Sequence, residues 1–346
     1  MDIKSMIEKV VKLGGDELYL KIGTQPLVRI NDVLSSMDLP ALIEGDMNDL
    51  IETLLTKDEI VKFQKNGIFE ANYFGQSPCN FRISLFHSQQ SPVAYIKIIN
   101  SEIPELKDLD LPASLANLLG SPKGILILAG PSRSGISTTM AALVEHMNRK
   151  YKRHILVIED PIQYYFEPKN SIISQRQLTK DIFMVEQGIN FAKRMDVDTL
   201  VIGDIKRDLP YKNIVEYVAG GKQIIICLQS LGVVATLEKI VYSFHENDRD
   251  FANKVITENL LAVISQASLP GSNNKENVPV YEVFIHNRNT EKITQSGKYQ
   301  QLEGNISSAG ADSVLFRQSL LKLVEAKKIT KSVAEAFYES YKGIRL

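Results

Sequence analysis

Hydrophobic and polar positions follow two different patterns along the chain. In residues 1–13, apolar side chains recur every three or four positions, which predicts a short amphipathic helix. Further helices are predicted over 46–55 and 57–66. Short apolar runs bounded by turn residues predict strands over 18–21, 27–30, 69–73, 80–86 and 94–99. The strands 69–73 and 80–86 would form a hairpin through a turn at 75–78. The first hundred residues therefore predict a small α+β domain with a mostly antiparallel sheet.

The pattern changes after residues 101–113, a segment with two prolines and several charges that predicts a linker. Residues 114–346 then alternate short apolar runs with helical segments, which predicts an α/β domain with a parallel sheet covered on both faces. The predicted strands are 124–129, 154–158, 199–202 and 223–228, with a helix over 137–148 and a hairpin of 261–268 and 278–285 joined by a polar turn at 270–277.

The C-terminal residues 313–342 are predicted to be helical. Their apolar positions would bury one side of the helix, and these are Leu315, Leu320, Leu321, Leu323 and Val324.

Composition narrows the class of protein. The 346 residues are 44% hydrophobic and 23% charged, which is typical of a soluble globular chain. Lys and Arg number 40 against 41 Asp and Glu, so there is no basic excess for non-specific nucleic-acid binding. The two cysteines, Cys79 and Cys227, lack metal-ligand spacing and predict reduced thiols in a cytosolic protein. No apolar run approaches the length of a membrane span, so any membrane association would be peripheral.

The most informative segment is a phosphate-binding loop that lacks its lysine. Residues 130–138 read Gly-Pro-Ser-Arg-Ser-Gly-Ile-Ser-Thr, whereas a P-loop reads Gly, four residues, Gly, Lys, then Ser or Thr. Gly130, Gly135 and Ser137 match, and Ile136 replaces the lysine. The loop follows an apolar strand and opens a helix, which is the context that a P-loop requires.

Such a loop binds phosphate through inward-pointing backbone N–H groups and the helix N-terminus, neither of which requires a lysine. The candidate contacts include Ser132 and Ser134 within the loop. Ser137 is the candidate Mg²⁺ ligand, although a plain helix N-cap is the alternative, and Thr138 is a candidate for the α-phosphate. A charge-assisted hydrogen bond contributes roughly 1.5–3 kcal/mol, so Ile136 would weaken nucleotide binding by about tenfold to a hundredfold.

Two further motifs place acids at the ends of predicted strands. Residues 158–163 read Ile-Glu-Asp-Pro-Ile-Gln, and residues 200–204 read Leu-Val-Ile-Gly-Asp. Carboxylates at the carboxyl ends of parallel strands face the ligand crevice of open α/β sheets. Asp204 would then hold magnesium or orient water, as a Walker-B acid does. A turn at Asp160-Pro161 is the simpler interpretation of the first motif.

These blocks together resemble the type IV pilus retraction ATPases, the PilT and PilU relatives of the secretion ATPase superfamily. The matching segments run nearly end to end, at 14–20, 81–82, 124–130, 154–162, 175–176, 201–204 and 263–266. The resemblance implies a PAS-like N-terminal domain followed by a RecA-like P-loop ATPase domain, with Arg82 as a nucleotide contact.

The departures from the family pattern converge on the same site. Besides Ile136, Gln163 stands where the family has its catalytic glutamate, Asp204 where it has the Walker-B glutamate, and Gln229 where it has the histidine of its His box. Lys206-Arg207 stand near the position of the family's arginine. A glutamine cannot accept a proton from water at neutral pH. The scaffold is therefore predicted to persist while ATP hydrolysis is weak or absent.

The resemblance also implies a ring of six subunits that binds ATP and Mg²⁺ weakly or not at all. The partners implied are an active retraction ATPase and the inner-membrane platform protein of the pilus, on the cytoplasmic side of the inner membrane and without nucleic acid. Two alternatives remain. One is a working ATPase that uses Arg133 or Lys123 as its phosphate cation. The other is an assembly or regulatory protein that binds no nucleotide.

Overall fold

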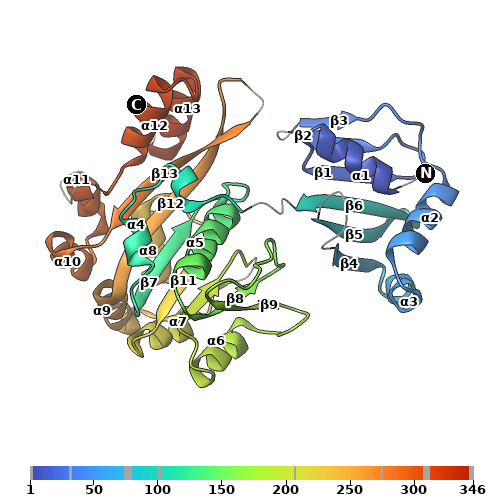
Figure 1. Ribbon diagram of the computed structural model, residues 1–346. Helices are drawn as coiled ribbons and strands as arrows, with labels where there is room; N and C mark the ends of the chain where they lie inside the picture. The colour runs from blue at the N-terminus through green and yellow to red at the C-terminus, as the bar shows by residue number, and fades with distance from the viewer. Residues whose placement is uncertain are drawn as a thin grey trace. The chain divides into compact units, whose positions relative to one another are not determined.

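The computed structural model describes residues 3–30, 33–73, 80–99, 103–205, 208–273, 276–306 and 312–342. The chain divides into two compact units, Met1–Glu102 and Ile103–Leu346 (Figure 1). Each unit has a hydrophobic core of its own. The predicted hairpin turn at 75–78 and Cys79 lie outside the described residues.

The first unit is an antiparallel sheet with three helices. The sheet has the order β3-β2-β1-β6-β5-β4. Its strands are β1 (Glu17–Lys21), β2 (Leu27–Ile30), β3 (Val33–Ser36), β4 (Ile68–Tyr73), β5 (Asn80–Ser88) and β6 (Ser91–Ile99). The helices are α1 (Ile3–Lys12), α2 (Glu44–Leu54) and α3 (Lys57–Asn66). The antiparallel prediction is therefore confirmed, and β3 is an additional strand whose four residues are all exposed.

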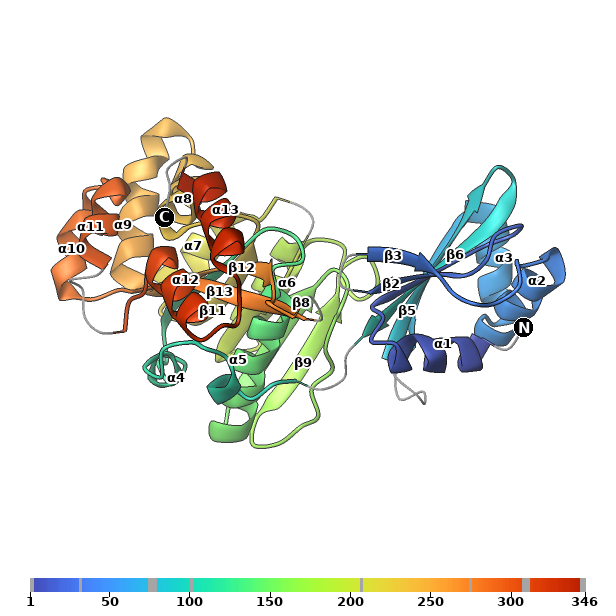
Figure 2. The same ribbon diagram turned by 90° about the horizontal axis from the view of Figure 1, so that it is seen from above.

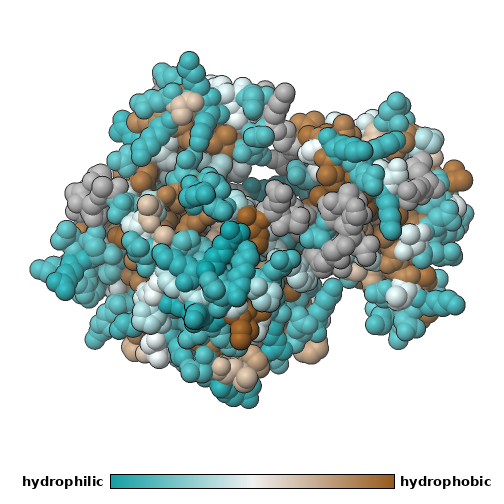
Figure 3. Space-filling view, viewed as in Figure 1, coloured by the Kyte–Doolittle hydropathy of each residue, from teal (hydrophilic) through white to brown (hydrophobic). Residues whose placement is uncertain are grey.

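Apolar surface remains on the β3 edge of this sheet. Val33 is 63% exposed and Leu34 is 44% exposed, and brown side chains lie at the surface over β2 and β3 in Figure 3. All four residues of β3 are exposed, so neither face of this strand is buried. Its sequence therefore lacks the period of two that predicts a half-buried strand.

The second unit is built on a seven-stranded sheet of order β13-β12-β7-β11-β10-β8-β9. Only β13 runs antiparallel to its neighbour. The strands are β7 (Gly124–Ala129), β8 (His154–Glu159), β9 (Ile172–Gln177), β10 (Thr199–Ile202), β11 (Gln223–Leu228), β12 (Leu260–Pro270) and β13 (Asn277–Ile285). The predicted parallel sheet is confirmed, with β9 as a strand that the sequence pattern did not indicate.

Helices cover both faces of this sheet (Figure 2). Alternate residues of β7 enter separate cores, with Ile125 and Ile127 on one face and Leu126 and Leu128 on the other. The first core also contains residues of α6 (Val185–Arg194), α7 (Tyr211–Ala219), α8 (Val233–Tyr242) and α9 (Arg249–Asn259). The second contains residues of α5 (Ile136–Lys150) and α4 (Leu115–Leu118). Burial on both faces explains the continuous apolar runs of these strands.

The segment Ile103–Ala113 packs on the second unit. Ile103, Leu106 and Leu111 contact its core beside α5, and residues 106–108 form a 3₁₀ turn, η1 (Leu106–Asp108). An ion pair joins Lys328 Nζ to Asp110 Oδ2 at 2.7 Å. The division between the two units accordingly falls at residues 102 and 103.

The C-terminal region, predicted to be helical over 313–342, forms two helices in the structure. They are α12 (Phe316–Glu325) and α13 (Lys331–Lys342), preceded by α10 (Arg288–Gln295), the 3₁₀ turn η3 (Tyr299–Gln301) and α11 (Leu302–Ile306). Lys327 has a φ of 54°, which breaks the helix, and the hydroxyl of Thr330 accepts from the N–H of Val333 at the start of α13. Leu320 and Leu323 are buried, but Leu321 is 45% exposed because it points away from their face.

A buried carboxylate connects these helices to the sheet. Glu282 of β13 is 2% exposed. It accepts hydrogen bonds from the N–H of Val233 at 2.8 Å and from the N–H of Phe316 at 3.4 Å, the first residues of α8 and α12. Its other neighbour is the hydroxyl of Tyr341 on α13. One side chain thus caps two helix N-termini. Burial raises its pKa above the ordinary value.

Glu282 is expected to make stability depend on pH. Because its pKa is higher in the folded state than in the unfolded state, its contribution is fully present below the unfolded pKa, near pH 4. That contribution is lost as the pH rises through the folded pKa. The difference in unfolding free energy between the wild type and Glu282→Gln should therefore fall as the pH rises from about 4 to 7. Urea unfolding of both proteins at several pH values measures it, and a constant difference would contradict the prediction.

Candidate nucleotide-binding site

Four candidate segments of the second unit lie at one edge of the sheet. Because β7, β8, β10 and β11 run parallel, the residues that follow them meet at their common carboxyl edge. These are the loop after Ala129, Gln229 after β11, Asp204 after β10, and Asp160 to Gln163 after β8. Strand β11 separates the loop-bearing strand β7 from β10, which carries the acid.

The loop from Gly130 to Gly135 has the backbone that a phosphate cradle needs. Arg133 and Gly135 have φ values of 66° and 86°. Gly135 precedes the first residue of α5, so the loop ends at a helix N-terminus. Gly130 has no room for a side chain, because a Cβ there would lie 2.4 Å from the carbonyl oxygen of Gln266. Closely approached glycines and N–H groups at a helix N-terminus suit a bound anion.

The side chain of Gln266, on β12, fixes this loop through hydrogen bonds. Its Nε2 donates to the carbonyl oxygen of Ser134 at 2.7 Å, and its Oε1 accepts from the hydroxyl of Thr139 at 2.6 Å. Gln266 and Thr139 are both buried, where lost hydrogen bonds are costly. In the sequence, Gln266 stands out only within a segment that resembles the family. It lies 127 positions from Thr139, so local sequence order does not indicate their contact.

Ile136 is the first residue of α5 and is half-buried. It packs against the core that also contains Leu128, Met140 and Val201. An apolar side chain at this position therefore has apolar neighbours. It offers no donor to a phosphate, and the backbone of the loop must provide whatever anion binding remains.

The hydroxyl of Thr138 already has a partner. It lies 2.8 Å from the hydroxyl of Tyr164, on the segment after β8. Burial raises the pKa of Tyr164, and Gln175 of β9 fixes the segment by donating to the Tyr164 carbonyl at 2.7 Å. Tyr164 is a site residue that sequence reasoning missed, because only the fold brings it to the first turn of α5. Gln163 is half-buried between this tyrosine and the buried Ile162.

Gln229 reaches the loop. Its Nε2 lies 3.4 Å from the hydroxyl of Ser132, and its carbonyl oxygen accepts from Nζ of Lys239 at 2.6 Å. The structure therefore brings together two candidates that are 97 residues apart in sequence. An uncharged amide in this place can donate or accept a hydrogen bond, but it cannot carry the positive charge available to a histidine.

Two acidic residues, Glu159 and Asp204, lie at the same carboxyl edge of the sheet. Glu159, at the end of β8, is fully buried, and Asp204 is half-buried. The pKa of the buried Cys227 thiol is raised first by burial and then by the charges of Glu159 and Asp204, which places all three near one another. Lys206 and Arg207 lie outside the described residues. Arg82 lies on β5 of the first unit, in a different unit from the loop.

Within the residues that the structure describes, no group of three or more His, Cys, Asp or Glu side chains is arranged to hold a metal ion. No helix in these ranges has the length and apolarity needed to cross a membrane.

The fold and the site together define a RecA-like P-loop domain joined to a smaller antiparallel unit. Comparison with known proteins places the chain more narrowly. The sequence profile of the family described as "Type II/IV secretion system protein" matches residues 77–298, well over half of the chain. The protein belongs to this type II/IV secretion system family.

Individual relatives have names from pilus biology. The chain is 25% identical over 310 residues to the "Twitching motility protein" of Neisseria gonorrhoeae, covering 89% of this chain and 83% of the relative. It is 24% identical over 330 residues to the type IV pilus retraction ATPase PilT of Pseudomonas aeruginosa, covering 94% and 95%.

A solved structure agrees with these relatives. The pilus retraction motor PilT with bound ADP superposes with a TM-score of 0.87 at 27% identity, covering 97% of this chain and 96% of that one. The resemblance inferred from the sequence motifs is thereby confirmed. The end-to-end coverage shows that both units take part in the similarity.

Proposed function

We propose that this protein is a pilus retraction ATPase-type subunit that retains a phosphate-binding loop but hydrolyses ATP weakly or not at all. Its work would be that of a nucleotide-binding or structural component in a pilus motor. The observation that carries the proposal is the contrast within one site. Gly130, Gly135 and Gln266 keep the loop in a binding shape, while Ile136 packs into the core where a lysine would meet phosphate.

The residues present fit the phosphates of a nucleotide. The backbone N–H groups at the start of α5 would bind them, and the hydroxyl of Ser137 would bind Mg²⁺. When bound, Mg²⁺ neutralises phosphate charge. Gln163 can position a water molecule but cannot take its proton. Asp204 keeps a carboxylate just after β10, the strand that β11 separates from β7.

The assembly that we propose follows from the similarity to PilT. The protein would form a homo-oligomer, a hexamer, and act at the cytoplasmic face of the inner membrane with an active retraction ATPase and the pilus platform protein. What supports this is the end-to-end match to a pilus retraction motor and the names of the relatives.

A working ATPase with a substitute cation is the second candidate. Lys123 does not suit that role, because it precedes β7 and the loop follows it, and six strand residues span about 20 Å. Arg133 is exposed on the loop itself and is the one remaining candidate that the sequence singled out.

Phosphate release and nucleotide-dependent stability separate these functions. We expect the full chain with Mg·ATP to release phosphate no faster than Asp204→Ala does. We also expect Mg·ADP to raise its melting temperature, because a ligand that binds only the native state stabilises it. Turnover that Asp204→Ala abolishes would establish a working ATPase. Absence of any nucleotide effect on melting would indicate an assembly protein that binds no nucleotide.

A further inference from the structure

Two hydroxyl groups join the first turn of α5 to the segment that follows β8. The hydroxyl of Thr138, the third residue of α5, lies 2.8 Å from the hydroxyl of Tyr164. Thr138 is the candidate contact for the α-phosphate, and Tyr164 directly follows Gln163. The pair therefore connects a candidate phosphate contact to a residue that lies outside the P-loop motif.

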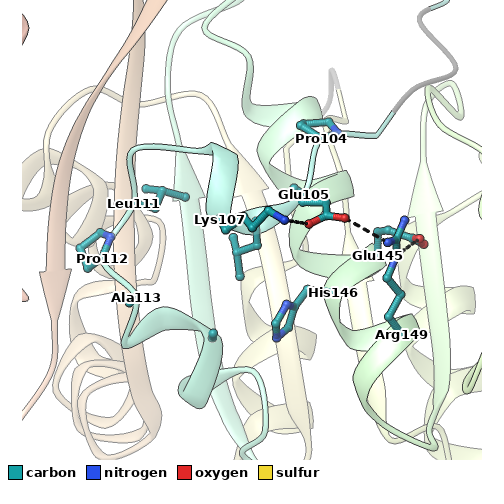
Figure 4. Close-up of a pocket in the computed structure, with 12 residues that line it drawn as sticks. Pro104, Glu105, Lys107, Leu111, Pro112, Ala113, Glu145, His146 and Arg149 are labelled. Atoms are coloured by element: carbon teal, nitrogen blue, oxygen red, sulfur yellow. Dashed lines mark hydrogen bonds and ion pairs between the residues drawn. The ribbon is translucent and has the colours of Figure 1, made fainter.

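The segment after β8 lies along α5 and is attached to the C-terminal half of that helix. Nδ2 of Asn148 donates to the carbonyl oxygen of Glu167 at 2.8 Å, and Oδ1 of Asn148 accepts from the N–H of Lys169 at 3.2 Å. The ammonium of Lys169 also binds Glu145, which is drawn in Figure 4 with its ion pair to Arg149. These bonds hold the segment on α5 independently of the hydroxyl pair.

A second attachment fixes Tyr164 to β9. Nε2 of Gln175 donates to the carbonyl oxygen of Tyr164 at 2.7 Å, and Oε1 of the same amide accepts from the N–H of Phe166 at 3.1 Å. Phe166 is buried, and the side chain of Tyr164 packs against the same hydrophobic core. The fold itself therefore places the Tyr164 hydroxyl beside Thr138, as a preorganised group requires.

The hydrogens of the pair can be assigned from the acidity of the two groups. A phenol is more acidic than an aliphatic hydroxyl, so Tyr164 is the better donor. Burial raises the pKa of Tyr164 above its ordinary value, so its hydroxyl keeps its hydrogen at pH 7 and can donate it to Thr138. This is the one hydrogen bond that the Thr138 side chain makes within the described residues, so the hydrogen of Thr138 has no acceptor there.

A phosphate group would be an acceptor for that hydrogen. Thr138 lies in the first turn of α5, where backbone N–H groups and the helix dipole favour a bound anion. A hydrogen bond from a hydroxyl to a phosphate is charge-assisted and about twice as strong as a neutral one. Because hydrogen bonds in series polarise one another, donation by Tyr164 also strengthens donation by Thr138.

We propose that Tyr164 is a positioning residue for nucleotide binding, which donates to Thr138 and so directs the Thr138 hydrogen to a phosphate of a nucleoside diphosphate. Tyr164 acts through Thr138 and does not touch the phosphate itself. This inference rests on the proposed function, because it needs a nucleotide at the loop. It assigns part of the affinity for that nucleotide to a residue outside the P-loop motif.

Titration of the full chain with Mg·ADP tests this role. Tyr164→Phe should raise the dissociation constant about three- to tenfold, the contribution of one neutral hydrogen bond. Thr138→Val removes the donor to the phosphate and should raise it about tenfold to a hundredfold. The double variant should bind no more weakly than Thr138→Val alone. A tyrosine that touched the nucleotide directly, or that only held the segment in place, would weaken binding in both backgrounds, and that result would overturn the proposal.

Three further variants separate the hydroxyl pair from its surroundings. Tyr165→Phe removes the same atom from the next residue, whose side chain is 45% exposed, and Lys169→Met removes the ion pair to Glu145. Both should bind Mg·ADP as the wild type does. Thr138→Ser keeps the hydroxyl and should keep the effect of Tyr164→Phe.

The wild type itself distinguishes the two ways in which the inference can fail. If the wild type binds Mg·ADP and Tyr164→Phe binds it equally well, the positioning role is refuted and the proposed function stands. If the wild type binds no Mg·ADP, the nucleotide-binding function and the positioning role are refuted together.

Discussion

A chain carrying Ile136→Lys together with Gln163→Glu is expected to bind Mg·ATP about tenfold to a hundredfold more tightly than the wild type. It is also expected to release phosphate at least about a hundredfold faster. The lysine adds a charge-assisted hydrogen bond of roughly 1.5–3 kcal/mol. The glutamate restores a group that can accept a proton, and general bases contribute about 10²–10⁴ in rate.

The structure indicates that the first substitution can be accommodated. Ile136 is half-buried at the first turn of α5, and a lysine stem can cover the same apolar surface while its ammonium extends into solvent. The loop around it keeps its glycines and its bonds to Gln266. The double variant restores two of the four departures, the charge at position 136 and the proton acceptor at position 163, and leaves Asp204 and Gln229 in place.

Nucleotide titration and phosphate release of the double variant measure this result. The matched control is Ile136→Met with Gln163→Glu, which has an unbranched side chain of similar volume and no charge. If the lysine and methionine proteins bind Mg·ATP equally, the missing charge does not limit binding, and the site has lost more than these two groups.

Gly130→Ala is expected to destabilise the second unit by about 1–3 kcal/mol and to remove any stabilisation by nucleotide. A Cβ at this position would lie 2.4 Å from the carbonyl oxygen of Gln266 and 2.5 Å from Oγ of Ser134. The first neighbour is backbone within β12, so it cannot move without disturbing the central sheet. The loop must shift instead, and its N–H groups would leave the positions that bind phosphate.

Thermal unfolding with and without Mg·ADP measures both effects. Gly304→Ala is the matched control in the same unit, because a Cβ at this exposed helical position meets nothing within 4 Å. It should leave stability unchanged or raise it by about 0.4–1 kcal/mol through the unfolded state. Equal melting temperatures for the two variants would show that the loop tolerates the added methyl group.

Most of the regular elements were predictable, because their hydrophobic patterns are local. The strand at 124–129 and the helix at 57–66 have the observed bounds, since continuous apolar runs and capping residues mark their ends. Strands β3 and β9 were not predicted. The four residues of β3 are all exposed, and β9 carries four polar residues in a row, from Ser174 to Gln177, so neither shows an apolar run. The sequence pattern did not locate the break between α12 and α13, because residues 326–330 carry neither proline nor glycine.

The residues of the candidate site also fall into two groups: those that the local sequence indicates and those that only the fold brings together. Local order alone pointed to the loop at Gly130–Thr138 and to Asp204, since each follows a recognisable apolar strand. The interactions of Thr138 with Tyr164 and of Gln229 with Ser132 are long-range contacts. No local pattern marks the residues that the sheet order brings together.

By itself, the sequence determined the two kinds of domain, the family resemblance and the loss of the loop lysine, because these depend on residue identity and local periodicity. The tertiary structure alone decided that Gln266 supports the loop and that Ile136 packs into the core. These depend on which segments meet in space, and hydrophobic burial is non-directional. Strand order and buried hydrogen bonds select the meeting points, and neither can be read from a linear pattern.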